Sequence, residues 1–368
     1  MLHRQTKAAC LCFASPTGLE VRRGAVYLGC YIALLTVLRP ETNTPPLTVK
    51  MLPLLTQIFT TNKNDPSAVN ELALKLLKPV SFTQALTLAS EDVLVQALQS
   101  PFPSTNILAI AVLEKAARAP GDTAILSVMR RVVGTFLRTW LSTPHVEVGE
   151  RATKALGDLL SMDSDHRRAA TYDSMMHGME ISSQTPPGQG LLWRRVFHDR
   201  EIYHSLFDLC SFKTAGTGEG LLDVRQKSLA QARLLQILPR LVALDFTAVT
   251  TTNFPDIEQQ FGMRKGEEGI LWFAATDMVN KEEDMLMHIM VIDFFPALIK
   301  VMSMGWSIPE PTGDCAYVKR LVQTVTATDI VVRKTLEAME MDLDSPYVLV
   351  SWLRFLRDAR INDGRGDY

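Results

Sequence analysis

The sequence predicts an all-α protein built from stacked helical repeats, and three observations support this fold class. Apolar residues recur at three- and four-residue spacing along nearly the whole chain, convincing runs of alternating apolar and polar residues are missing, and one helical pattern returns about every 40 residues. Of the 368 residues, 47% are apolar and 21% are charged, so the chain can bury a large core.

The helical spacing marks the first segments in chain order. The core positions that it predicts are Leu72, Leu76 and Leu77; Leu108, Val112 and Leu113; Leu156, Leu159 and Leu160; and Leu234, Leu235 and Leu238. Residues 281–302 and 345–359 are also amphipathic and are interpreted as later repeats. The clustered methionines Met285, Met287, Met290, Met302 and Met304 are interpreted as core filling. The threonine-rich stretch "FTAVTTTNF" (246–254) precedes Pro255 and is predicted to be a connecting loop, as are 182–190, 213–220, 261–269 and 307–314.

A repeat is visible in four aligned segments, in which alanine and leucine follow a small or valine-type residue on one helix face. They are "SAVNELALKLL" (67–77), "TNILAIAVLEK" (105–115), "VEVGERATKALGDLL" (146–160) and "LDVRQKSLAQARLL" (222–235). Their equivalent residues Val69, Ile107, Val148 and Val224 are 38, 41 and 76 positions apart, the last being two periods of 38. This period predicts an α-solenoid of HEAT/armadillo-like repeats over 46–360, although the leucine-rich helices of any bundle also align in this way.

The two ends of the chain are predicted to lie outside the repeats. Residues 1–45 form an atypical N-terminal segment, with one helix over the apolar stretch 24–38, which is too short for a membrane span. Residues 1–23 are basic like a transit peptide, so a buried first helix, organelle targeting and a signal peptide all stay open. Residues 361–368, with an Arg365-Gly366-Asp367 triplet, are interpreted as a flexible tail.

Composition and motifs argue against several function classes. The chain has 38 basic and 40 acidic residues and no strongly basic domain, so direct nucleic-acid binding is not expected. Its five cysteines form no CxxC pair, which is typical of a reducing compartment; we expect a cytoplasmic and also a nuclear location. No phosphate-binding loop and no GxSxG motif is present, and we predict a non-enzymatic protein without cofactor, metal or membrane contact.

The stretch "GLLWRRVFHDREIYHSLFDLC" (190–210) is the strongest candidate for a binding site. We expect Asp199 to cap a helix that starts at Arg200 and His198 to lie in the turn between two helices. The stretch concentrates residue types that dominate protein interfaces. The predicted partner-binding residues are Trp193, Arg194, Arg195, His198, Asp199 and Arg200, and alanine at Arg194 and Arg195 is expected to weaken partner binding without changing helix content.

A helical metal-dependent hydrolase is the alternative from a different class. It would use His198, Glu201 and His204, which at i, i+3 and i+6 fan over about 120 degrees of a continuous helix. This differs from the zinc-protease pattern, in which two histidines are four residues apart. Asp284 and His288, four residues apart on one helix face, are a weaker metal-ligand pair.

Residues 188–211 ("GQGLLWRRVFHDREIYHSLFDLCS") together with 146–160 resemble the HEAT-like assembly chaperones of the 26S proteasome base, the family named for proteasome non-ATPase regulatory subunit 5. Some members carry a DNA mismatch-repair label. The resemblance implies a solenoid without catalytic residues that is monomeric before binding and holds the carboxy-terminal domains of proteasome base ATPase subunits in a curved groove. This chain is short for the family, and its first 40 or so residues do not look like repeats, so part of that groove is expected to be missing or rewritten. A helical-repeat adaptor with another partner stays open.

Overall fold

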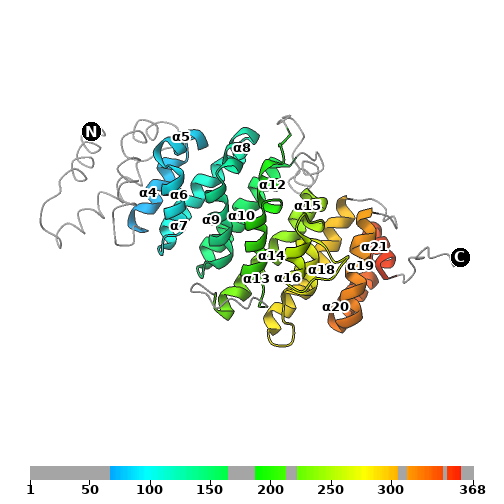
Figure 1. The fold of residues 1–368 in the computed structure, drawn as a ribbon. Coiled ribbons are helices and arrows are strands. Elements are labelled where there is room, and N and C mark those ends of the chain that lie inside the picture. The colour runs from blue at the N-terminus through cyan, green and yellow to red at the C-terminus, as the bar shows by residue number, and fades with distance from the viewer. Residues whose placement is uncertain (1–66, 165–186, 213–221, 306–312, 343–345, 358–368) are drawn as a thin grey trace, which may run out of the picture. The chain divides into compact units, whose positions relative to one another are not determined.

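A computed structural model describes residues 67–164, 187–212, 222–305, 313–342 and 346–357 (Figure 1). Every regular element within these ranges is a helix, so the all-α prediction is confirmed. Contacts between Cα atoms divide the chain into two compact units, 1–115 and 116–368. The segments predicted at 1–45 and 361–368, the loop 213–220 and most of the loops 182–190 and 307–314 lie outside the described residues.

Unit 1 is described from residue 67 onward. Its helices are α4 (Ser67–Leu77), α5 (Phe82–Leu88), α6 (Glu91–Leu98) and α7 (Pro103–Leu113). Ser81 and Ser90 cap α5 and α6 with their side chains, and α7 begins at a proline, whose missing N–H costs nothing at that position. Helix α7 packs on α4 and α6. The short helix η1 (Glu114–Arg118) follows as the chain enters unit 2.

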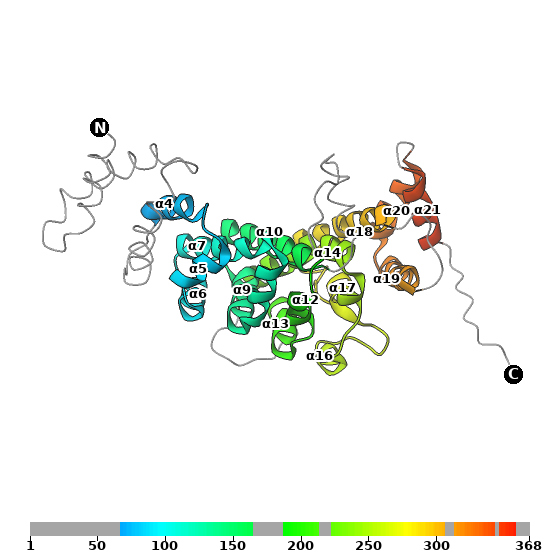
Figure 2. The ribbon, with the colours of Figure 1, turned by 90° about the horizontal axis from the view of Figure 1, so that it is seen from above.

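Unit 2 contains the remaining described helices. They are α8 (Pro120–Val128), α9 (Arg130–Ser142), α10 (Val146–Asp163), α12 (Leu191–Phe197), α13 (Arg200–Cys210), α14 (Val224–Leu244), α15 (Phe246–Thr250), α16 (Pro255–Gln260), α17 (Gly269–Thr276), α18 (Met285–Gly305), α19 (Gly313–Thr328), α20 (Ile330–Met341) and α21 (Tyr347–Arg357). Helices α10, α14, α18 and α20 follow one another in a row, each packed on the next (Figure 2). Helix α9 packs on α10, α13 and α14, so it connects α13 to this row.

Helix α14 organises unit 2 because its buried polar side chains bind the carboxyl ends of its neighbours. The last carbonyl groups of a helix have no partner within that helix and must find one elsewhere. Three side chains of α14 supply these partners: Lys227 Nζ donates to Ser211 O (2.6 Å), Gln231 Nε2 to Cys210 O and Met278 O (both 2.7 Å), and Arg233 Nη1 to Trp140 O (2.9 Å), Leu141 O (3.2 Å) and Thr143 O (2.9 Å). Helix α14 thus ties the ends of α9 and α13 into one core.

Two glycines of α10 make room for two arginines of α14. A Cβ atom at Gly149 would lie 2.3 Å from Nε of Arg233, and one at Gly157 would lie 2.3 Å from Nη1 of Arg240. Arg240 lies against Gly157 and donates from Nη2 to Asp158 Oδ1 (2.9 Å). Glycine at these positions is therefore explained by close helix packing, since both lie inside α10 and neither has a positive φ.

The predicted core positions are nearly all buried, and the prediction for one segment is wrong. Of the predicted leucine and valine positions, Leu108 alone is half-buried. Residues 246–254 are not a loop throughout, because α15 occupies Phe246–Thr250. The Asp245 side chain accepts the N–H of Ala248 (3.0 Å), and Phe246 and Val249 are buried, so capping and burial outweigh the poor helix propensity of threonine.

Helix α18 is long and apolar enough to cross a membrane by length and composition, over Met285–Met304. It packs, however, on α14, α20 and α21, and one face is buried through residues such as Phe295 and Leu298. This is how the core helix of a folded unit behaves. The methionine prediction holds for Met287 and Met302, which are buried, and is wrong for Met285 and Met304, which are exposed.

Candidate functional site

The 190–210 stretch folds as two short helices joined at His198 and Asp199, as predicted. Helix α12 ends at Phe197 with His198 as its C-terminal cap residue, and α13 begins at Arg200. The Asp199 side chain caps α13 by accepting the N–H groups of Glu201 (3.2 Å) and Ile202 (3.5 Å). The turn therefore has a fixed backbone.

The amino end of α12 is held by a buried carboxylate from α10. Asp163 Oδ2 accepts the N–H groups of Leu192 (2.6 Å) and Trp193 (3.2 Å), and Trp193 Nε1 donates to Leu160 O (2.9 Å). Burial raises the pKa of Asp163, and the backbone N–H groups offset this only in part. Trp193 is buried and stacks on Phe197, so the prediction that it contacts a partner is corrected: it is part of the core.

Asp199 is the centre of an ion-pair cluster that joins three helices. Its side chain is 7% exposed and accepts from Arg130 Nε (2.7 Å) and Nη2 (2.9 Å) and from Arg195 Nη1 (2.8 Å). Burial by itself raises the pKa of Asp199, but the hydrogen bonds from Arg130 and Arg195 outweigh it, so the pKa lies below the ordinary value. Asp199 is therefore a buried structural anchor, which corrects the prediction that it contacts a partner.

The cluster brings three turns between helices side by side. Arg195 Nε donates to Ser127 O (2.9 Å), which attaches α12 to the end of α8. Arg200 pairs with Asp256 at the start of α16, and its guanidinium lies 5.6 Å from the ring centroid of Phe254. The α8–α9, α12–α13 and α15–α16 turns are thus linked by ion pairs and hydrogen bonds. We call the side chains of Arg130, Arg194, Arg195, His198 and Arg200 the arginine edge.

The members of the arginine edge differ in how freely they meet solvent. Arg130, Arg195 and Arg200 are held by the contacts above, yet their side chains remain 49%, 29% and 58% exposed. Arg194 and His198 are exposed, and the described part of the chain offers neither of them an ion-pair partner. The sequence could not place Arg130 or Asp256 here, because they lie 69 and 56 residues away from their partners.

The residues of the alternative hydrolase do not come together. Glu201 pairs with Arg130 (3.0 Å), His204 lies edge-on to the ring of Phe261, and His198 is exposed. Across the described ranges, no group of three His, Cys, Asp or Glu side chains is arranged to hold a metal ion. The weaker pair is also used structurally: His288 Nε2 contacts Asp329 Oδ2 (2.8 Å), and Asp284 caps Met287 and accepts from Ser228.

A buried carboxyl lies behind the arginine edge, which the sequence did not indicate. Glu258 Oε1 accepts from Tyr203 Oη (2.7 Å) and from the N–H of Gly269 (2.9 Å), which joins α13 to α16 and α17. Burial raises the pKa of Glu258 and also that of Tyr203. Both groups are therefore held by hydrogen bonds between helices.

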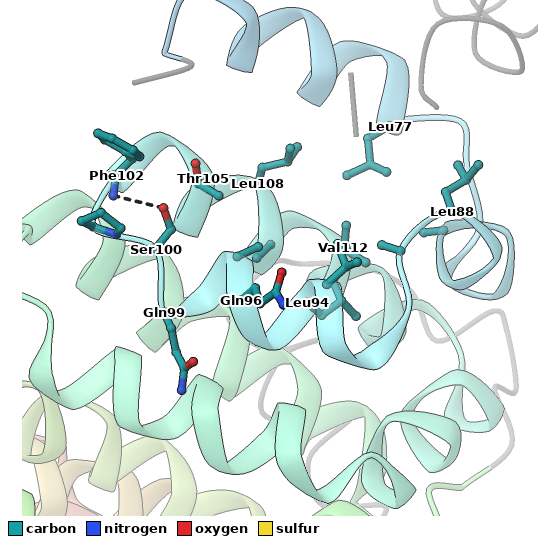
Figure 3. Close-up of a pocket in the computed structure, with 16 residues that line it drawn as sticks. Leu77, Leu88, Leu94, Gln96, Gln99, Ser100, Phe102, Thr105, Leu108 and Val112 are labelled. Carbon is teal, nitrogen blue, oxygen red and sulfur yellow. Dashed lines mark hydrogen bonds between the residues drawn. The ribbon is translucent and has the colours of Figure 1, made fainter. Parts of the chain in front are cut away.

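A separate cavity of about 420 Å³ lies within unit 1, among α4, α5, α6 and α7 (Figure 3). Its lining is mainly apolar, with Leu77, Leu94, Leu108 and Val112 among the lining residues, and contains no ionisable side chain. Asn106 fixes one end of it by donating to Ala97 O, Leu98 O and Ser100 O. Its lining can enclose an apolar group, and its polar side chains are uncharged.

The structure separates the two arginines that the sequence treats as equivalent. Removing Arg195 also removes its bonds to Asp199 and to the carboxyl end of α8, so a loss of binding by this variant would be ambiguous. Arg194 carries no such contact among the described residues. Arg194 is therefore the position at which a partner contact can be tested without disturbing the fold.

We expect Asp199→Asn to destabilise unit 2 by about 2 kcal/mol at pH 7, because asparagine keeps the helix cap but loses the charge that holds two arginines. Since the folded pKa of Asp199 is lowered, its contribution is complete above the unfolded pKa of about 3.9 and is lost as the pH falls through the folded value. Urea midpoints of the two proteins should therefore converge in acid. A difference that stays constant down to the folded pKa would contradict the charge-based explanation.

No protein-family model matches this sequence, and no curated protein matches it significantly.

Proposed function

We propose that this protein is a non-catalytic helical-repeat scaffold that binds a protein partner through the arginine edge, and that it acts as an assembly chaperone of the 26S proteasome base by holding ATPase subunits. The observation that carries the binding role is the arrangement of the edge. Its arginines come from α9, α12 and α13, and Arg130, Arg195 and Arg200 are held in position by Asp199 and Asp256 while remaining partly open to solvent. Such fixed arginines are typical of interface hot spots.

The helix packing supports a solenoid as the form of the scaffold. The four segments aligned in the sequence coincide with α4, α7, α10 and α14. Within unit 1, α4 packs on α7, and within unit 2, α10 packs on α14 and α14 on α18. Neighbouring helices of a solenoid share their apolar faces in this manner, with small residues at the close contacts.

The proteasome role rests on the sequence resemblance, and one structural observation is compatible with it. The two segments that carry the resemblance, 146–160 and 188–211, form α10 and the α12–α13 pair. Helix α10 packs directly on α12, and Asp163 and Trp193 bond the two together. The resembling residues therefore form one continuous piece of structure. Its ionisable groups serve mainly as caps and ion pairs, which suits a binding protein without catalytic residues.

The experiment that tests the proposed function is affinity purification of the tagged full-length protein from its own cells, followed by mass spectrometry. We expect proteasome base ATPases to be recovered in the absence of the mature core particle. Recovery of intact, folded protein without any ATPase would overturn the chaperone role. Consistent recovery of a different partner would favour the adaptor alternative.

A further inference from the structure

We infer that the arginine edge binds an acidic protein segment that also carries an apolar side chain, with carboxylates on Arg130, Arg194 and Arg195 and the apolar group on Val128. This inference rests on the proposed function, because it names the chemistry of the partner at the same site. It adds a charge requirement and an apolar anchor.

The hydrogen bonds within the edge leave specific donors open. Arg130 uses Nε and Nη2 for Asp199 and Glu201, and no described residue accepts from its Nη1. Arg195 uses Nε and Nη1, which leaves its Nη2, and Arg194 keeps its whole guanidinium. Guanidinium groups bind carboxylates with strong, directional hydrogen bonds, so acceptor oxygens of negative charge complement these donors.

The edge is ordered before a partner arrives. Arg130 and Arg195 share the buried Asp199, and Arg195 is also bonded to a backbone carbonyl of α8. Ordering a long side chain at an interface costs about 0.5–1.5 kcal/mol, and here most of that cost is met on folding. A partner carboxylate therefore meets donors in fixed positions.

The net charge of the arginine edge is positive. The four arginines of the edge face the carboxylates of Asp199, Glu201 and Asp256, and of these Asp199 is buried while Asp256 is paired with Arg200. This leaves Arg194 as an uncompensated positive charge beside the half-exposed Arg195. An acidic partner supplies the missing negative charge.

An apolar spot adjoins these cations. Val128 follows Ser127, whose carbonyl binds Arg195, and Val128 is 74% exposed at the end of α8. Ile125, one turn earlier in the same helix, is also exposed. A protein segment with an apolar residue next to its acidic residues covers both kinds of surface at once.

A nucleic acid fits this surface less well. Nucleic-acid binding requires an extended basic field, whereas this chain has a net charge of -2 and the edge is short and flanked by apolar residues. The phosphate backbone would also leave Val128 without a partner.

The test is fluorescence anisotropy of the full-length protein with a fluorescein-labelled peptide of four Glu-Glu-Leu repeats. The comparison probes are the same peptide with glutamine in place of glutamate and a single-stranded DNA of similar length. We expect the acidic peptide to bind most tightly and its affinity to fall as NaCl rises from about 50 to 300 mM. Arg194→Glu should weaken its binding about tenfold or more, and Val128→Ser several-fold.

Arg225→Glu is the matched control, since Arg225 is exposed in the first turn of α14 and lies outside the edge. It should leave peptide binding within about twofold of the unmodified protein, a difference of less than one RT in free energy. Circular dichroism and urea midpoints should show that all variants stay folded. Equal binding of the glutamine peptide, tighter binding of the DNA, or unchanged binding by Arg194→Glu would each overturn the inference.

The same variant separates this inference from the proposed function. If Arg194→Glu recovers the ATPases as well as the unmodified protein does, the acidic-segment inference fails and the chaperone role stands. If the acidic peptide binds as expected and no ATPase is recovered from cells, the chemistry of the edge stands and the chaperone role fails.

Discussion

Replacing Arg233 with methionine is expected to destabilise unit 2 by about 3 kcal/mol, one of the two largest mutational effects that the structure predicts. Arg233 is 4% exposed, and its Nη1 donates to three backbone carbonyls at the end of α9. Methionine fills a similar length but cannot donate, so these carbonyl groups lose their partners within the core. Removing the buried positive charge, whose burial also lowers the pKa of Arg233, recovers only part of this loss.

Urea unfolding monitored by tryptophan fluorescence measures this loss of stability. All five tryptophans of the chain lie after residue 115, so the signal reports unit 2 alone. The stability of Arg233→Lys should lie between those of the unmodified protein and Arg233→Met, because an ammonium group reaches fewer of the carbonyl groups than the planar guanidinium. A methionine variant as stable as the unmodified protein would show that water replaces the arginine.

Gly149→Ala should cause much of the same loss through the same contact. Its Cβ would lie 2.3 Å from the guanidinium of Arg233, and moving the guanidinium away would lengthen its bonds to the carbonyl groups of α9. The double variant Gly149→Ala with Arg233→Met should therefore lose clearly less stability than the sum of the losses of the two single variants. Gly134→Ala in α9 is the control, since its Cβ meets only Ile202 at 3.7 Å and alanine there favours the helix.

Gly269→Ala is the second large effect, with an expected destabilisation of about 3 kcal/mol. Gly269 has φ +87°, a region that costs an L-residue energy, and its Cβ would lie 2.5 Å from the backbone of Val249 and Thr250. Because the obstacle is backbone, a change of rotamer cannot relieve it. The shift would also pull the Gly269 N–H away from Glu258, the buried carboxyl that receives Tyr203 of α13.

Gly266→Ala separates the two causes of this loss. Gly266 has φ +91°, but the space where its Cβ would lie is open. This variant should lose only about 1 kcal/mol, the cost of the backbone conformation. If both variants lose the same amount in the tryptophan-monitored urea transition, the close approach of α15 to Gly269 contributes nothing.

The sequence predicted the helices well where apolar spacing carried the signal. Leu156, Leu159 and Leu160 are buried as expected, and Asp199 caps α13 as its residue type and position indicate. It failed where long-range contacts outweighed local preference. The threonines of 246–250 gave no reason to expect α15, which forms because Phe246 and Val249 find a buried environment.

The turn at His198 and Asp199 was predicted, but the roles of the side chains around it were not. Residue type singled out Trp193 and the arginines, which are common in interfaces, and Asp199 was added for its position beside them. The structure assigns both to the interior, Trp193 in the core and Asp199 beneath two arginines. It also adds Arg130 from α9, whose role depends on a partner far away in the chain.

The sequence by itself determined the fold class, most helix positions and the turn at His198 and Asp199, because apolar periodicity and helix capping act over a few residues. The tertiary structure alone decided which charged side chains anchor the turns and which face solvent. It also explained the glycines at positions 149 and 269, since each has its role in a contact with another helix. Such contacts depend on how helices pack, so a local pattern of residues does not predict them.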